Sequence, residues 1–151
     1  MGTPTGSLSF TFDAVEAQLF AERYDPRPVH LGRPPDATLP PGTMSGMFIA
    51  AEVQRYLLMA LGIPNAELVL GTSFTMNWIR PIVGGENVRL EWRAIRTWNG
   101  KPGMFKVRVE FEVKRLPPFW SHAGPELVGS GVLRQRWRPV SDDPGTRARP
   151  E

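Results

Sequence analysis

An aspartate and a histidine lie on one short, proline-stiffened segment near the start of the chain, Asp25-Pro26-Arg27-Pro28-Val29-His30. Each proline fixes its own φ and pushes the residue before it towards extended geometry, so a stiff loop is predicted here. A carboxylate beside an imidazole can orient water and move protons near neutral pH. The residue types alone also fit an ordinary solvated turn with a half-buried histidine, and both interpretations stay open at this point.

The composition excludes several other kinds of site. The chain has 151 residues and no cysteine, so disulfides, thiolate catalysis and cysteine-based metal sites are excluded. Its two histidines, His30 and His122, give no metal-binding spacing, and no metal site is predicted. The small net charge of +3 is a weak case for nucleic acid. No apolar run has the length of a membrane span and the polar start is not a signal peptide, so we expect a soluble, cytoplasmic protein without nucleic-acid or membrane partners.

The first third of the chain is predicted to form a strand, a helix and a loop. Residues Ser7 to Phe12 alternate between apolar and polar types, as in a strand. Asp13, with Glu16 three residues later, is typical of a helix start, and the helix should run from about Ala14 to Arg23. The four prolines between positions 33 and 42 indicate an irregular loop.

A second helix is predicted to be unusually apolar. Thr43 or Ser45 can cap it, and Gly62 and Pro64 should close it after Leu61. Only three polar side chains interrupt its apolar surface, namely Glu52, Gln54 and Arg55. A helix that is apolar almost all round should be buried inside another element.

The rest of the chain supplies that element. Alternating patterns predict strands over residues 68–78, 88–94, 105–113 and about 127–138. Strands with one charged and one apolar face form an antiparallel sheet covered on one side. The predicted fold class is therefore α+β with the hotdog architecture, an antiparallel sheet wrapped around a central buried helix. We expect a single domain over residues 1–138 and a flexible tail over 139–151.

From about Leu8 to Trp137 the sequence also resembles the MaoC-like hotdog dehydratases and hydratases that act on acyl thioesters. The residues that carry the resemblance are Phe12-Asp13, the segment Tyr24 to His30, Ser45-Gly46-Met47, and Trp78-Ile79-Arg80-Pro81-Ile82. The hydratase motif of that family has four residues between Asp and His and a proline two positions before the His. Asp25, Pro28 and His30 match it.

The resemblance implies a lyase of fatty-acid metabolism that hydrates 2-enoyl thioesters or dehydrates 3-hydroxyacyl thioesters. The thioester would be carried by coenzyme A or by an acyl-carrier protein, and no cofactor would be needed. Asp25 and His30 would hold and activate the water. Because negative charge gathers on the thioester carbonyl, we expect the N–H groups of Gly46 or Met47 at the helix start to bind it. Ser45 and Arg27 complete the predicted substrate-binding set.

Three departures from the family pattern keep other functions open. This chain has Arg27 where many hydratases have asparagine, Ser45 where they often have histidine, and Ala51 where some have serine. The alternatives are an acyl thioesterase on the same fold and a non-catalytic acyl- or CoA-binding subunit.

Two further expectations concern partners. One sheet around one helix leaves edges open, and members of the family are dimers, so a homodimer is predicted. Five arginines of the strand region could bind coenzyme A phosphates or form a solvated face: Arg80, Arg89, Arg93, Arg96 and Arg108.

Overall fold

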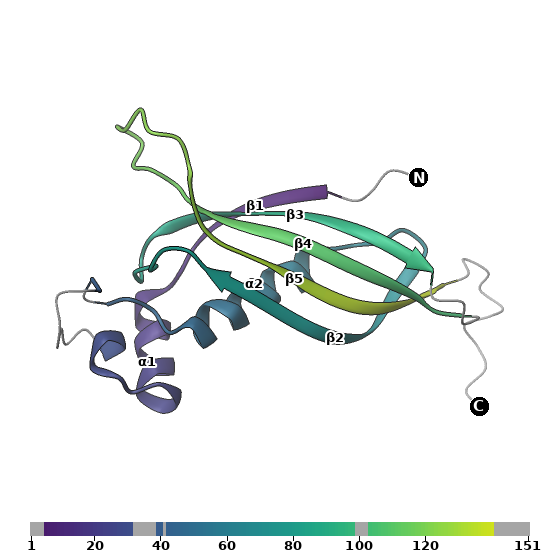
Figure 1. The fold of residues 1–151 in the computed structure, drawn as a ribbon, viewed down its shortest axis with the longest axis horizontal. Helices are drawn as coiled ribbons and strands as arrows, with labels where there is room; N and C mark the ends of the chain where they lie inside the picture. Colours follow the sequence, from purple (N-terminus) through teal and green to yellow (C-terminus); the bar gives the residue numbers. More distant parts are fainter. Residues whose placement is uncertain (1–4, 32–38, 41, 99–102, 141–151) are drawn as a thin grey trace.

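The fold is one curled sheet with a helix lying along it (Figure 1). The computed structural model describes residues 5–31, 39–40, 42–98 and 103–140. The elements follow in the order β1 (Thr5–Thr11), α1 (Ala14–Tyr24), the 3-10 turn η1 (Pro28–Leu31), α2 (Gly46–Ala60), β2 (Ala66–Trp78), β3 (Asn87–Trp98), β4 (Phe105–Arg115) and β5 (Glu126–Pro139). The predicted α+β class is confirmed.

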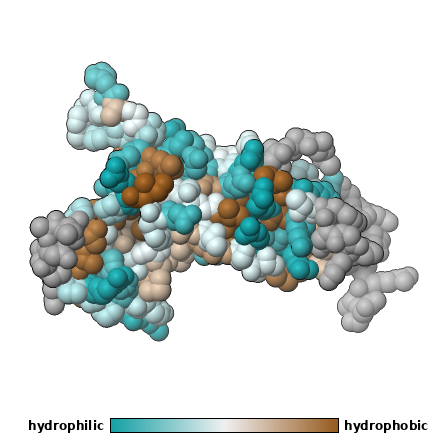
Figure 2. All heavy atoms as spheres, in the orientation of Figure 1, coloured by the Kyte–Doolittle hydropathy of each residue, from teal (hydrophilic) through white to brown (hydrophobic). Residues whose placement is uncertain are grey.

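The five strands have the order β1-β3-β4-β5-β2, and every neighbouring pair is antiparallel. In β4 the apolar residues from Phe105 to Val113 are buried at every second position, and the charged residues between them face outwards. The sheet therefore has an inner face against the core and a charged outer face, as the alternation predicts. Figure 2 shows hydrophilic side chains interrupted by apolar patches on the face in view.

Helix α1 begins and ends for local reasons. The Asp13 carboxylate accepts hydrogen bonds from the backbone N–H groups of Val15 (2.8 Å) and Glu16 (2.9 Å), which confirms the predicted cap. The helix runs to Tyr24, one residue further than predicted. Asp25 ends it, because Pro26 cannot continue a helix.

Helix α2 is only partly enclosed, which corrects the prediction of a helix buried all round. Phe48, Ile49, Val53 and Leu57 are buried against the sheet. Leu58 and Met59, in contrast, are 52% and 73% exposed. The physical reason is that a five-stranded sheet can cover only one side of a helix, so one apolar flank of α2 stays uncovered in a single chain.

Strand β2 departs from the strict alternation predicted for it. Its register with β5 shifts between Leu68 and Leu70 and again between Gly71 and Ser73. Each shift is typical of a β-bulge, where one extra residue changes which face the following side chains occupy. As a result only Phe74 and Met76, of the alternate positions from Leu68 to Trp78 that the pattern places on one face, pack against the core cluster.

Several predictions fall on residues that are not described. Most of the predicted loop lies outside the described residues, at positions 32–38 and 41, and so do positions 141–151 of the predicted tail. The Asn99-Gly100 sequence, which is typical of a turn before the strand predicted from residue 105, also lies outside them. Strand β5 continues to Pro139, one residue past the predicted domain boundary. No helix in the described part of the chain has the length and hydropathy needed to cross a bilayer.

A glycine in the inner face gives a test of the packing. A Cβ added at Gly131 would lie 2.2 Å from the carbonyl oxygen of Thr75 and 2.6 Å from Cζ of Phe111. We expect Gly131→Ala to lower the free energy of unfolding by about 1–3 kcal/mol, because the core would be overpacked. Gly71→Ala is the matched control, since nothing lies within 4 Å of its added Cβ. Urea unfolding of both variants measures the difference, and equal stabilities would contradict this account of the packing.

Candidate active site

The carboxylate of Asp25 is buried and is bonded on both oxygens. It is 8% exposed, at the position that ends α1. The Arg27 guanidinium donates to it as a fork, with Nε 2.7 Å from Oδ1 and Nη2 2.8 Å from Oδ2. The hydroxyl of Ser45 donates to Oδ2 at 2.8 Å from the start of α2. A buried charge needs such partners, and the Ser45 bond connects the proline segment to the start of α2.

These contacts set the protonation state of Asp25. The hydrogen bonds from Arg27 lower the pKa of Asp25 from 3.8 to about 2, against the opposing effect of burial. The Ser45 hydroxyl and the charge of a protonated His30 act in the same direction as Arg27. Asp25 is therefore an ionised carboxylate and a very weak base at neutral pH.

His30 points one ring nitrogen at a backbone carbonyl and the other at Asp25. Its Nδ1 lies 2.6 Å from the carbonyl oxygen of Thr43. A carbonyl can only accept, so Nδ1 carries a hydrogen and Nε2 is the nitrogen that can bind or release a proton. Nε2 is buried 3.4 Å from Oδ2 of Asp25 and has no hydrogen-bond partner among the described residues.

The carbonyl that orients His30 is itself held in place. Thr43 forms an isolated β-bridge with Val83, and the N–H of Met44 donates to the carbonyl of Ile82 at 2.8 Å. The bridge connects the segment before α2 to the turn before β3. The orientation of the imidazole thus depends on backbone pairing far away in sequence.

The start of α2 offers backbone N–H groups beside this pair. The Ser45 carbonyl accepts the Ile49 N–H at 3.1 Å, but the Ser45 side chain makes no capping bond. The first N–H groups of the helix, at Gly46 and Met47, have no partner within the helix because of their position in it. Together with the helix dipole they favour negative charge at this end.

A cavity of about 320 Å³ connects these features. Its polar lining includes Arg27, His30 and Arg80, and its apolar lining includes Val29, Leu39, Ile49, Trp78, Ile79 and Ile82. Gly46 also lines it, and a Cβ there would lie 3.1 Å from Nε1 of Trp78. Asp25 is not in the lining and lies behind Arg27 and His30. The cavity is an apolar chamber with the imidazole in its wall, as ligand sites commonly are.

The structure brings together most of the residues singled out from the sequence. Asp25, Arg27, His30 and Ser45 form one cluster, and Gly46 lines the cavity next to it. The alternative of an ordinary solvated turn is wrong, because the Asp25 carboxylate is buried and its Oδ2 lies 3.4 Å from Nε2 of His30. The alternative that Ser45 is an ordinary helix cap is also wrong, since its hydroxyl bonds the Asp25 carboxylate instead.

Other residues of the site have roles that the sequence does not predict. The Met47 side chain is 53% exposed and is not among those that line the cavity, so only its N–H remains of interest. Thr43 was considered only as a possible helix cap, and its carbonyl orients His30 instead. No sequence pattern predicts this role for a backbone carbonyl. Trp78 could have been found, because it belongs to a motif that carries the family resemblance.

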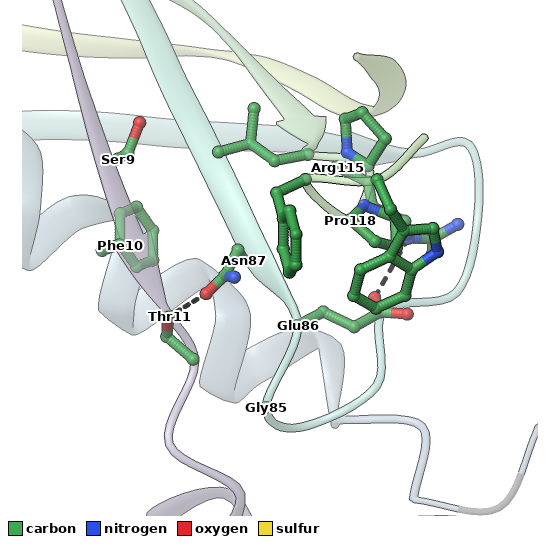
Figure 3. A pocket seen from close by; sticks show the side chains of 12 residues that line it. Ser9, Phe10, Thr11, Gly85, Glu86, Asn87, Arg115 and Pro118 are labelled. Carbon is green, nitrogen blue, oxygen red and sulfur yellow. Dashed lines mark hydrogen bonds and ion pairs between the residues drawn. The ribbon is translucent and has the colours of Figure 1, made fainter. Parts of the chain in front are cut away.

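A larger cavity, of about 710 Å³, lies elsewhere (Figure 3). It lies between β1, the start of β3 and the segment after β4, and it contains none of the predicted site residues. Its charged groups are already paired, since Nε of Arg115 lies 3.1 Å from Oε2 of Glu86. It lacks an oriented imidazole, so we assign the candidate active site to the smaller cavity beside His30.

Comparisons with known proteins support the fold. No protein-family model matches the sequence, and no curated protein matches it either. Among solved structures, a MaoC-like dehydratase from Rhodospirillum rubrum is similar at a TM-score of 0.72 and 19% identity, covering 93% of this chain and 94% of that one. The R-hydratase PhaJ1 from Pseudomonas aeruginosa has a TM-score of 0.64 and 20% identity, covering 95% and 90%.

A third similar structure is the ChsH1-ChsH2 complex from Mycobacterium tuberculosis. It has a TM-score of 0.55 and 16% identity, covering 89% of this chain and 98% of that one. Identities this low establish the shared fold only. The chain therefore has the hotdog fold of the MaoC-like proteins, as the sequence predicted.

The Arg27–Asp25 ion pair predicts a defined pH dependence of stability. A folded-state pKa of about 2, below the unfolded value of 3.8, stabilises the fold above about pH 5 and is lost as the pH falls through 2. We expect Arg27→Gln to raise the Asp25 pKa and to reduce stability at pH 7 by on the order of 1 kcal/mol, discounted because Arg27 is largely exposed. NMR titration of the Asp25 carboxyl and urea unfolding between pH 2 and 7 measure both effects.

The control is Arg23→Gln, which removes an exposed arginine that makes no ion pair with Asp25. Its stability difference from the natural protein should stay the same across this pH range. A stability loss for Arg27→Gln that is as large at pH 2 as at pH 7 would show that the pair does not act through the Asp25 charge.

Proposed function

We propose that this protein is a hydratase or dehydratase that adds water to 2-enoyl thioesters or removes it from 3-hydroxyacyl thioesters. One observation carries the proposal. The imidazole of His30 lines an apolar cavity that also reaches the start of α2, and its Nε2 lies 3.4 Å from Oδ2 of Asp25, a carboxylate whose pKa is lowered to about 2. Two proteins of the same fold are described as a dehydratase and a hydratase, which supports this class of reaction.

The roles of the two side chains follow from their environments. Asp25 is too weak a base to take a proton from water, because the Arg27 hydrogen bonds keep its pKa at about 2. We assign it the task of stabilising the imidazolium that forms. His30 is the base, since Thr43 holds its Nδ1–H and Nε2 is the nitrogen that can take up a proton. This is the division of labour expected when a carboxylate and an imidazole act together.

The proposed addition balances in protons and electrons. Water attacks C3 of the enoyl group while Nε2 of His30 takes one of its protons, and the electron pair of the double bond moves through C2 to the thioester oxygen. The N–H groups of Gly46 and Met47 stabilise that oxygen, where the helix dipole adds to the effect. The imidazolium then returns the proton to C2, which gives the 3-hydroxyacyl thioester and restores His30.

The first experiment follows the loss of enoyl-thioester absorbance with a series of enoyl-CoA chain lengths. We expect His30→Gln to lower kcat by about 10²–10⁴-fold, which is the usual contribution of a positioned acid–base group. Asp25→Asn should also lower kcat, because it removes the charge that stabilises the imidazolium. His122→Gln changes the only other histidine, which is exposed, and should leave kcat unchanged.

The same experiment separates the alternatives. Release of free thiol without loss of the double bond would favour an acyl thioesterase. Binding of acyl-CoA with neither reaction would favour the non-catalytic subunit. Hydration that His30→Gln leaves unchanged would falsify the assignment of the site.

We further propose that the protein functions as a homodimer formed through β2. This strand has 13 residues and lies at one edge of the sheet. It exposes Leu68, Val69 and Leu70 in a row, beside the uncovered flank of α2. An apolar edge strand is prone to pair with another chain, and a second copy related by a two-fold axis would cover both surfaces.

Sedimentation velocity tests the dimer. We expect the natural protein to sediment as a dimer and Leu70→Asp to shift it towards the monomer, because a charge at the edge opposes strand pairing. Leu19→Asp is the control, since Leu19 is equally apolar and 59% exposed but lies on α1. If both variants sediment as the natural protein does, the β2 edge is not the interface.

A further inference from the structure

The charges on the outer face of the sheet are balanced over one half of it. Nε of Arg89 lies 3.2 Å from Oε1 of Glu91, and the Lys114 amine lies 2.8 Å from Oε2 of the same carboxylate. Arg93 lies 2.8 Å from Glu110. The arginines of the strand region that were considered as phosphate ligands are thus mostly engaged with carboxylates. A cation paired in this way binds an added anion less strongly than an unpaired cation does.

The other half of the outer face gathers positive charge instead. Across β4 and β5, Lys106 lies directly opposite Arg136, and Arg108 directly opposite Arg134. Like charges in directly opposed positions destabilise a sheet. Arg108 shares Glu110 with Arg93, at 3.1 Å. Among the described residues, no carboxylate lies within ion-pair distance of Lys106, Arg134 or Arg136.

The four cations line a real depression. They border a groove of about 260 Å³, together with Thr72 and Thr97, and we call these six residues the basic groove. Thr72 is placed there by a bulge, because the pairing of β2 with β5 passes from Gly71 to Ser73 and leaves Thr72 as the extra residue. Bulges commonly redirect a side chain next to a functional site. The groove therefore combines four cations with two hydroxyl groups.

We propose that the basic groove binds a compact anion of the diphosphate class. Neighbouring strands are about 4.8 Å apart and alternate residues of one strand about 6.8 Å apart, so the four cations start from the corners of a small rectangle. Two linked phosphate groups present several oxygens within such an area, and arginine forks bind phosphate oxygens in pairs. The basic groove shares no residue with the cavity beside His30, so this proposal does not depend on the hydratase activity.

Calorimetric titration with sodium pyrophosphate at low salt tests the proposal. We expect saturable binding with one site per chain, weakened at least tenfold by Arg134→Gln and by Arg136→Gln. Arg89→Gln is the matched control, because it removes an outer-face arginine that is already paired with Glu91. It should change the affinity by less than twofold. No saturable binding, or an equal loss in the control, would overturn the proposal.

Two further measurements make the test independent of fold effects and identify the source of the phosphates. Because Arg134→Gln removes a repulsion, it should raise the thermal midpoint at low salt, and a lowered midpoint would contradict the repulsion. If coenzyme A competes with pyrophosphate and pantetheine does not, the thioester carrier is the source of the phosphate groups. If ADP displaces pyrophosphate and coenzyme A does not, the ligand is a free nucleotide. If heparin binds and pyrophosphate does not, the proposal of a compact diphosphate site is overturned.

Discussion

The buried carboxylate of Asp25 is the constraint on which the rest of the site depends. A carboxylate at 8% exposure must be compensated, and here the compensation comes from two directions. Arg27 approaches along the chain from two residues away, and Ser45 approaches from the start of α2. Removal of either partner would leave the buried charge with too few hydrogen-bond donors. The Ser45 bond also connects the proline segment to the start of α2. The position of His30 depends on these bonds, because the 3-10 turn that contains it follows this segment directly.

The sheet and the helix both leave apolar surface exposed. The inner face of the sheet covers Phe48, Ile49, Val53 and Leu57, but it cannot reach the opposite flank of α2. The bulges in β2 add to the exposed apolar area, because they turn apolar residues away from the core at the edge of the sheet. A chain that folds around a single helix in this way leaves apolar area exposed on both the helix and the edge strand.

The parts of this molecule that sequence could predict are those governed by neighbours in the chain. The Asp13 cap and the alternation in β4 are local patterns, and both are confirmed. The proximity of Asp25 and His30 was also accessible, because two prolines restrict the residues between them. The role of Ser45 was not, since a serine before a helix ordinarily caps it, and only the folded chain brings Asp25 within reach of its hydroxyl. The Thr43 carbonyl and the β2 bulges are likewise set by pairing with distant strands.

Arg27 changes the electrostatics of the site in a way that its neighbours must accommodate. An arginine cannot lose its charge, so the fork turns Asp25 from a base that could share a proton into a fixed anion. The ion pair as a whole is neutral, and it contributes little net field to an oxygen that becomes negative some distance away. Stabilisation of that oxygen then falls to the N–H groups at the start of α2, which is also why the Ser45 hydroxyl matters twice. By bonding Asp25 it secures the anion, and by not capping its own helix it leaves the N–H group of Met47 available to a ligand. One hydroxyl group therefore connects the two halves of the site.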